Sequence, residues 1–309
     1  MSTNKPLVSI IIPCFNSAKF VSRSIDSALS QSYPYTEIIL VDNNSTDETL
    51  SILKDYQSRY PDKITVLTEL KKGAPAARNQ GLNAAKGEWI QFLDADDEIL
   101  TAKIDIQVNL ALQTNCHMII GNSIHHKKYH KKKVRPNKKP WVALINSRLG
   151  ITSSNLWSAN LLTLVNGWDE EITSSQEYHL LFKILKMKPT LSFDNNFNTL
   201  IYHQENSVSK ATDTKKLYNI LTNARLLRMS IKKYLQENNL YGKSEERAYE
   251  RFIFRHIVQY KQRCPEYYHE FKHLLKNNKY PLLSKCTLRT IVKLKPMIFF
   301  FIDLIKRRR

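Results

Sequence analysis

The chain contains little cysteine and little glycine for its 309 residues, and it has no long apolar run. Its four cysteines form no CxxC pair and no metal-type spacing, which argues against a disulfide framework and favours a reducing compartment. No stretch offers the roughly 20 consecutive apolar residues of a membrane-spanning helix. The first apolar run is short and typical of a strand, so we expect no signal peptide. These absences favour a cytoplasmic protein.

Negative charge is also scarce, and it is unevenly distributed. The whole chain carries a formal net charge of +19. Residues 1–120 hold 11 Lys and Arg against 14 Asp and Glu, a net of −3, and residues 121–214 hold 13 against 7, a net of +6. Residues 215–309 hold 23 against 7, a net of +16. This asymmetry indicates a polyanionic partner for the last third, such as nucleic acid, anionic lipid or a phosphate-rich substrate.

The first 120 residues do contain a regular alternation of strand and helix patterns. Short apolar runs rich in β-branched residues predict strands over 7–13, 36–42, 64–67, 88–93 and 117–122. Helical spacing of apolar or small residues predicts helices over 18–32, 45–60, 75–85 and 101–114. For the second helix, Ser45 followed by Glu48 is the pattern of a capping box with Ser45 as the N-cap. The alternation predicts βαβ units and a largely parallel sheet.

Three polar segments follow strands of this predicted sheet. They are residues 13–16, 42–44 and 94–97, and each lies at the carboxyl end of its strand. The carboxyl ends of parallel strands meet at one edge, where α/β sheets bind their ligands. We therefore expect these three segments to converge on one site.

The last of these segments concentrates acid in a basic chain, with Asp94, Asp96 and Asp97 within four positions. Acids placed before a helix can cap it or simply face water. Clustered carboxylates at a sheet edge also provide the hard oxygen ligands that Mg²⁺ binds together with substrate phosphates. Their position at the end of a predicted strand favours the metal site.

Other polar segments allow two interpretations each. Asp42 and Asn43 can meet a base or ribose, or can form a simple turn. In residues 71–82, small side chains can let a helix N-terminus and Arg78 approach phosphate, or can serve helix–sheet packing alone. Residues 125–140 are rich in His and Lys. We expect a solvated basic loop or hairpin there, because the lysine charges oppose binding of a metal cation.

Charge and pattern divide the chain into three regions. Residues 1–120 form one half of an α/β domain, residues 121–214 the other half, and residues 215–309 a helical basic extension. At the end of this extension, residues 291–309 combine an apolar patch with Lys306–Arg309. This composition is typical of an anchor that lies on a membrane surface, although a last core helix with a charged end fits the same pattern.

Several of these segments together resemble a known family. The strings LVSIIIPCFN, ILVDNNSTDET, GAPAARNQGL and IQFLDADDEIL occur in this order and at a spacing similar to the N-terminal half of family 2 glycosyltransferases. GITSSNLWS, NGWDE and SQEYHLLFKI resemble the acceptor half of that family. The resemblance covers roughly residues 6–210. It implies the α/β fold called GT-A, a Rossmann-like, mostly parallel sheet flanked by helices.

The resemblance also implies roles for residues around the donor. Pro13 and Asn16 would line the nucleotide pocket, and Asp42 and Asn43 would meet the base. Many members of the family have a second acid where this chain has Asn43, which leaves the identity of the base open.

The acid cluster corresponds to the DXD motif of the family. By resemblance, Asp94 and Asp96, with Asp97 adjacent, would hold Mg²⁺ or Mn²⁺ against the donor diphosphate. Arg78 would assist by approaching the phosphates. The metal would neutralise the nucleoside diphosphate as it departs.

The resemblance implies that Glu177 is the catalytic base, which deprotonates an acceptor hydroxyl during a single inverting displacement. The family usually has a Glu-Asp pair here, whereas this chain has Gln176 and Glu177. His203 could approach the metal or a phosphate, and it fits a surface histidine equally well.

The implied reaction transfers one sugar, a hexose or N-acetylhexosamine, from a nucleoside-diphosphate sugar to a hydroxyl group. UDP is the expected nucleotide, and the acceptor would be lipid-linked or a glycan in bacterial surface-polysaccharide biosynthesis. The chain has no Q-x-x-R-W motif and no spanning segment, which argues against a processive synthase. The basic C-terminal region would hold the enzyme at the inner leaflet of the cell membrane, as a peripheral cytoplasmic protein.

Two other functions fit parts of the sequence. A catalytically inactive relative could act as a membrane-associated protein, because Asn43 and Gln176 depart from the family pattern. The basic C-terminal region could instead bind nucleic acid. No helix-turn-helix, aromatic RNA-binding motif or zinc pattern accompanies it, so we expect no nucleic-acid partner.

Overall fold

The structure, a computed structural model, describes residues 5–127, 129–203 and 213–276. The chain divides into two compact units, Met1–Glu205 and Asn206–Arg309. Within the described ranges, none of the helices combines the length and the apolar character that crossing a bilayer requires.

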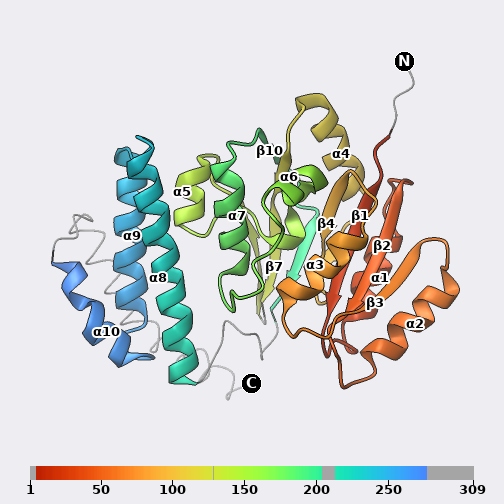
Figure 1. Ribbon diagram of the computed structural model, residues 1–309, viewed down its shortest axis with the longest axis horizontal. Helices are drawn as coiled ribbons and strands as arrows, with labels where there is room; N and C mark the ends of the chain where they lie inside the picture. Colours follow the sequence, from red (N-terminus) through yellow and green to blue (C-terminus); the bar gives the residue numbers. More distant parts are fainter. Residues whose placement is uncertain (1–4, 128, 204–212, 277–309) are drawn as a thin grey trace. The chain divides into compact units, whose positions relative to one another are not determined.

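The first unit is built around a seven-stranded sheet with the order β10-β6-β9-β4-β1-β2-β3 (Figure 1). Neighbouring strands are parallel except where β9 pairs with β4 and β6. This confirms the predicted α/β fold with a mostly parallel sheet. The strands are β1 (Val8–Cys14), β2 (Thr36–Asp42), β3 (Ile64–Thr68), β4 (Trp89–Phe92), β6 (Met118–Gly121), β9 (Leu156–Ser158) and β10 (Leu191–Asp194).

A smaller sheet in the same unit has the order β5-β11-β7-β8. The antiparallel pair β7 and β8 is a hairpin, which confirms one of the two forms expected of the basic segment. The strand β11 joins this hairpin to β5, the short strand that follows the acid cluster. The bounds are β5 (Glu98–Ile99), β7 (Ser123–Lys127), β8 (His130–Val134) and β11 (Thr199–Tyr202).

Helices cover both faces of the large sheet, which explains why its strands are continuously apolar. Alternate residues of β1, such as Ile10 and Ile12, pack in one core with apolar side chains of α1, α2 and α4. On the other face, α3 packs against β1 and β2. A Cβ atom on Gly81 of α3 would lie 2.4 Å from Ile11 Cγ2, so only glycine permits this approach. Gly81 therefore serves helix–sheet packing.

The predicted helices over 18–32, 75–85 and 101–114 are present within three residues of their expected ends. The helical elements of the first unit are α1 (Val21–Leu29), α2 (Thr49–Arg59), α3 (Ala74–Ala84), α4 (Lys103–Thr114), α5 (Pro140–Ile145), η1 (Thr152–Ser154), α6 (Ala159–Leu164) and α7 (Gln176–Lys186).

The predicted capping box at the start of α2 is wrong. The helix begins at Thr49, and its N-cap position is Glu48, which makes no side-chain cap hydrogen bond. Ser45 instead accepts a hydrogen bond from the Asn16 N–H at 3.1 Å. Asp47 accepts the Thr49 N–H at 3.0 Å. The loop before α2 is thus shaped by its contacts with the loop after β1, which a local capping pattern cannot reveal.

The second unit is helical as far as it is described, with α8 (Thr214–Glu237), α9 (Lys243–Gln259), α10 (Pro265–Phe271) and η3 (Lys272–Leu275). Helix α8 begins at Asp213, whose carboxylate accepts the Lys215 N–H at 2.8 Å, a typical N-cap. Apolar side chains of α8, α9 and α10 share one small core. The membrane anchor predicted for residues 291–309 lies outside the described residues.

Candidate active site

The loops that follow β1 and β2 meet at the carboxyl edge of the large sheet. Asn16 Oδ1 accepts the Thr46 N–H at 2.8 Å, and the Asn16 N–H donates to Ser45. Asn16 has a φ of 46°, in the left-handed region that asparagine tolerates better than most residues. Pro13 lies opposite Val41 in the β1–β2 register. The structure therefore brings Pro13 and Asn16 beside the end of β2, as the sequence predicted.

Asp42, the last residue of β2, is 2% exposed. One carboxylate oxygen, Oδ2, accepts the Ser45 N–H at 3.3 Å. The other, Oδ1, is buried and has no hydrogen-bond partner in the described part of the chain. A buried carboxylate oxygen normally has a donor, because leaving it unsatisfied is costly. Asp42 thus suits a ligand that supplies a hydrogen-bond donor, such as a nucleobase.

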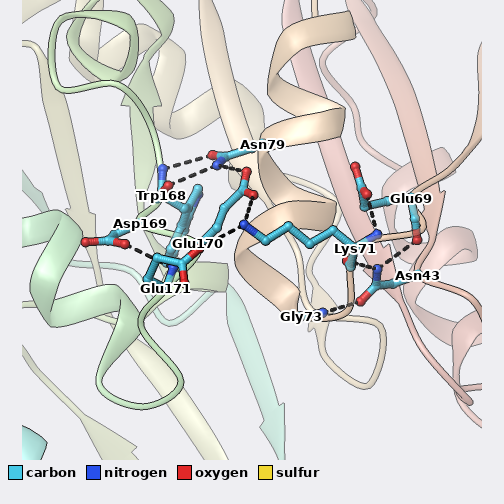
Figure 2. A network of polar contacts seen from close by, with 9 residues as sticks. All are labelled: Asn43, Glu69, Lys71, Gly73, Asn79, Trp168, Asp169, Glu170 and Glu171. Carbon is cyan, nitrogen blue, oxygen red and sulfur yellow. Dashed lines mark hydrogen bonds and ion pairs between the residues drawn. The ribbon is translucent and has the colours of Figure 1, made fainter.

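The side chain of Asn43 shapes the loop between β3 and α3 (Figure 2). Its Nδ2 group donates to the carbonyl oxygens of Glu69 at 2.9 Å and Lys71 at 2.8 Å. Its Oδ1 atom accepts the Gly73 N–H at 2.8 Å. These contacts require an amide, since a carboxylate cannot donate to the two carbonyls. Asn43 therefore has a clear structural role, and its contacts with the distant loop between β3 and α3 go beyond the simple turn that the sequence allowed.

Arg78 and Asp94 form a salt bridge next to the acid cluster. Arg78 Nη2 lies 2.7 Å from Asp94 Oδ1, and the Arg78 side chain is 9% exposed. The guanidinium carbon of Arg78 lies 4.5 Å from the centre of the Trp168 ring. Arg78 is thus held on one side by an aromatic ring and on another by the first acid of the cluster, which fixes the position of that carboxylate.

The other two acids of the cluster differ in their surroundings. Burial, followed by the charge of Asp94, raises the pKa of Asp96 to about 6. Asp97 is 4% exposed, and its two oxygens accept hydrogen bonds from Ser153 Oγ at 2.7 Å and from the Tyr202 N–H at 3.3 Å. Burial and the two neighbouring acids raise the pKa of Asp97 well above its usual value. Both carboxylate oxygens of Asp97 therefore accept hydrogen bonds from the protein, whereas the Asp96 carboxylate has fewer contacts with the described residues.

Glu177, in the first turn of α7, is linked to the acid cluster through η1. Its Oε1 atom accepts a hydrogen bond from Thr152 Oγ1 at 3.0 Å. The next residue, Ser153, donates to Asp97 and accepts the Asp94 N–H at 3.2 Å. Burial raises the pKa of Glu177 to about 8, and the charge of Asp94 adds to the shift. A carboxyl group with this pKa can take up and release a proton near neutral pH.

The acid cluster has the chemistry of a divalent-cation site. Burial is the main cause of the raised pKa of Asp96 and the charge of Asp94 is the second, so the carboxylates repel one another and a cation would relieve that repulsion. No group of three His, Cys, Asp or Glu side chains in the described ranges is arranged to hold a metal by itself. Because both oxygens of Asp97 already accept hydrogen bonds, Asp94 and Asp96 are the acids that fit a metal completed by substrate phosphates.

His203 lies at the end of β11, where its Nε2 atom is 2.9 Å from Nδ1 of His125. The two rings lie with their centres 5.1 Å apart. Burial, followed by the charge of His203, lowers the pKa of His125 to about 4. The structure therefore gives His203 a histidine neighbour in the small sheet.

A polar network that the sequence did not reveal joins the loop before α3 to the loop before α7 (Figure 2). Lys71 Nζ lies 3.0 Å from both Glu170 Oε2 and Glu171 Oε1. Asn79 Oδ1 accepts the Trp168 N–H at 2.9 Å, and its Nδ2 donates to Glu170 at 2.8 Å. Two strings noted in the sequence, GAPAARNQGL and NGWDE, supply most of this network. The resemblance of both strings to one family was the signal that the sequence offered for these segments. Only the structure shows that the two segments contact each other.

Comparison with known proteins identifies the family of the chain. The model of the family described as Glycosyl transferase family 2 matches residues 9–165 of the chain. The chain is 34% identical over 199 residues to UDP-Glc:alpha-D-GlcNAc-diphosphoundecaprenol beta-1,3-glucosyltransferase WfgD of Escherichia coli. That match covers 63% of this chain and 73% of WfgD. Several other curated relatives are matched over only 34% to 48% of their length, so the chain spans about half of them or less.

Two solved structures share the fold. Residues 1–349 of Staphylococcus aureus TarS, in complex with UDP-GlcNAc, match with a TM-score of 0.60 at 16% identity, over 89% of this chain and 93% of that chain. The mannosyltransferase PcManGT of Pyrobaculum calidifontis, in complex with GDP-Man and Mn²⁺, matches with a TM-score of 0.57 at 17% identity. This match covers 94% of this chain and 85% of PcManGT. At these identities the likeness establishes the fold alone.

Proposed function

The chain belongs to glycosyl transferase family 2, and we propose that it transfers one sugar from a nucleoside-diphosphate sugar to an acceptor hydroxyl with inversion. The observation that carries this proposal is the link between Glu177 and the acid cluster through Thr152 and Ser153. A base, a pair of metal-binding acids and a buried cation at one sheet edge are the groups that such a transfer needs.

Glu177 is the base in this proposal. Its raised pKa, about 8, lets it accept the proton of an acceptor hydroxyl as that oxygen attacks the anomeric carbon. The bond from the anomeric carbon to the diphosphate oxygen breaks as the new glycosidic bond forms, so a single displacement inverts the configuration. Thr152 orients the carboxylate by its hydrogen bond.

Asp94 and Asp96 would hold Mg²⁺ or Mn²⁺, and the metal would supply positive charge to neutralise the departing nucleoside diphosphate. Arg78 positions Asp94, and Asp97 supports the loop through Ser153 and Tyr202. The Mn²⁺ in the complex of PcManGT with GDP-Man supports the choice of metal.

The donor would lie at the carboxyl edge, with Pro13 and Asn16 lining the nucleotide pocket and Asp42 facing the base. Asn43 would contribute by holding the loop that closes one side of this pocket. Complexes of TarS with UDP-GlcNAc and the UDP-Glc specificity in the name of WfgD support a UDP-sugar, a hexose or N-acetylhexosamine. Residues 1–120 would thus bind the donor and residues 121–214 the acceptor.

The acceptor in this proposal is lipid-linked or a glycan, in surface-polysaccharide biosynthesis. The name of WfgD, which acts on a diphosphoundecaprenol-linked sugar, supports a lipid-linked acceptor. Such a lipid places the reaction at the inner leaflet of the cell membrane. The net charge of +16 over residues 215–309 suits peripheral binding to that anionic surface from the cytoplasm.

Release of UDP from a panel of UDP-sugars, with Mn²⁺ and GlcNAc-diphospholipid as acceptor, tests this proposal. We expect release with one sugar that depends on both acceptor and metal, and that Glu177→Gln reduces by about 10²-fold or more. Asp55→Asn is the control, because Asp55 is an exposed acid on α2 outside the proposed site. Binding of donor without turnover, unchanged in Glu177→Gln, would instead favour a catalytically inactive protein.

A further inference from the structure

A long part of the first unit has no acidic residue. Residues 106–168 contain nine Lys and Arg and no Asp or Glu. Most of these cations lie in or beside the hairpin β7–β8, where Lys131, Lys132 and Lys133 are consecutive and exposed. None of these three lysines takes part in a salt bridge within the described ranges. The hairpin therefore presents positive charge that the described protein does not balance.

The positive charge lies on both faces of the hairpin. Side chains alternate along a strand, so Lys131 and Lys133 point to one face and Lys132 to the other. Lys132 is paired in register with His125, and Lys127, two residues further along β7, shares that second face. A linear polyanion lying on a sheet contacts one face at a time. Charge on both faces of this hairpin, at the edge of its sheet, instead suits a layer of anionic groups that surrounds it.

The connection between β7 and β8 carries an exposed aromatic residue. The side chain of Tyr129 is 63% exposed and is followed by His130 and the three lysines. Tyrosine is favoured at the boundary between a membrane and water, where its ring meets the acyl region and its hydroxyl the headgroups. The combination of an aromatic tip with flanking lysines is thus typical of a segment that contacts a lipid surface.

The hairpin is joined to the proposed catalytic site through β11. The Tyr202 N–H donates to Asp97, and Tyr202 lies opposite His126 in the β11–β7 register. His126 in turn lies opposite Lys131 on β8, and its ring centre is 4.6 Å from that of Tyr202. The Arg23 guanidinium lies 3.7 Å from the Tyr202 ring centre. Tyr202, His126 and Lys131 lie side by side on β11, β7 and β8. They therefore connect the acid cluster to the lysines of the edge strand.

We propose that β7, β8 and Tyr129 form a docking surface for an anionic lipid bilayer, distinct from the basic C-terminal region. The lysines of both faces contact lipid phosphates, and Tyr129 lies at headgroup level. The inference rests on the proposed function, because a lipid-linked acceptor is what gives the docking its use. Docking through this hairpin brings the acid cluster near the headgroup layer, where the diphosphate of such an acceptor lies.

Cosedimentation of the full chain with phosphatidylcholine vesicles, with and without phosphatidylglycerol, tests the inference. The variant K131Q/K132Q/K133Q removes three charges without touching the proposed site. Since each lysine near an anionic surface contributes about a fivefold gain in binding, the loss of three predicts binding weaker by up to about 100-fold. The matched control K5Q/K54Q/K86Q removes three exposed lysines elsewhere in the same unit, and we expect less than about a threefold change.

A second variant, Tyr129→Ser, separates the aromatic contact from charge. We expect a smaller loss of vesicle binding that persists at high salt, because the ring does not act through charge. Equal vesicle binding by K131Q/K132Q/K133Q and the control would overturn the inference and assign membrane binding to the C-terminal region alone. If K131Q/K132Q/K133Q lost binding to a soluble anionic glycan such as hyaluronan but retained vesicle binding, the inference of a lipid-docking surface would be overturned in favour of a glycan-binding surface.

The vesicle assay needs neither donor nor metal. Nucleotide binding, measured on the same proteins, therefore separates failure of this inference from failure of the proposed function. Circular dichroism of each variant excludes unfolding as the cause of a loss.

Discussion

Arg78 and Asp94 form a salt bridge of 2.7 Å in which the cation is almost fully buried and the acid is about one-third exposed. The guanidinium also stacks on Trp168, so its position is fixed before any ligand arrives. In the proposed function, Arg78 orients the carboxylate of Asp94 toward the metal. A planar guanidinium is suited to both contacts, whereas a lysine ammonium is not.

We therefore expect Arg78→Lys to weaken Mn²⁺ binding by about 10-fold to 100-fold, the range typical of residues that orient metal ligands. Titration of Mn²⁺ in the presence of UDP, followed by calorimetry, measures the change. Arg59→Lys is the control, because Arg59 forms an exposed pair with Asp55 whose contribution is small. Equal Mn²⁺ affinity in wild type and Arg78→Lys would exclude the orienting role.

The pKa of Glu177 predicts the pH dependence of the reaction. Burial raises that pKa to about 8, and the base must be deprotonated, so kcat/KM should rise with pH and level off above about 8. The Thr152 hydrogen bond lowers the pKa of Glu177, so Thr152→Val should move the midpoint of the profile to higher pH. Glu177→Gln should reduce kcat by about 10²-fold to 10⁴-fold on the plateau above pH 8, and the difference from wild type should shrink as the pH falls below the pKa of Glu177. A Thr152→Val profile that coincides with that of wild type would contradict the assignment of the base.

Asn43 gives a prediction about stability. Its amide donates to two backbone carbonyls, and Asn43→Asp would place a carboxylate against both. Such a loss of buried donors costs about 1–3 kcal/mol in the free energy of unfolding. Urea denaturation measures this cost, with Asn83→Asp as an exposed control on α3. An unchanged free energy of unfolding in Asn43→Asp would mean that the acid common in this family is tolerated here without rearrangement of the loop.

Lys103 predicts a pH dependence of stability that is independent of the active site. It is fully buried, and Nζ donates to Gln107 Oε1 at 2.8 Å and to Gln91. Burial lowers the pKa of Lys103 from 10.5 to about 7. Between these two values the unfolded chain binds a proton that the folded chain does not, so this group makes stability rise with pH over that window.

Lys103→Met should remove this contribution. We expect the difference in melting temperature between wild type and variant to shift in favour of wild type as the pH rises from 7 toward 10. Differential scanning calorimetry over this range measures it. Parallel melting curves for the two proteins across the range would show that Lys103 keeps its ordinary pKa in the folded chain.

Much of the fold was predictable because the large sheet obeys local rules. Strands such as Thr36–Asp42 are apolar runs between clear turns, and they form where the pattern places them. The start of α2 was predicted wrongly, because Ser45 bonds to a loop that lies 29 residues earlier in the chain. Long-range contacts of this kind do not appear in a local pattern.

The same distinction applies to the site. The convergence of Pro13, Asp42 and Asp94 at one edge follows from the geometry of parallel strands. Other contacts depend on how the folded chain brings distant segments together. Glu177 accepts a hydrogen bond from Thr152, and Asn43 donates one to the loop between β3 and α3. Sequence reasoning could name these side chains, but their partners needed the structure.

In the proposed function, the acid cluster binds a divalent metal together with a nucleotide. Calorimetric titration of UDP into wild type and Asp96→Asn, each with Mn²⁺ and with EDTA, tests it most directly. We expect UDP binding to wild type that requires Mn²⁺ and that Asp96→Asn abolishes. Asp55→Asn, which changes an exposed acid on α2, should leave UDP binding unchanged. UDP binding of equal affinity in all of these proteins, with or without Mn²⁺, would contradict the claim.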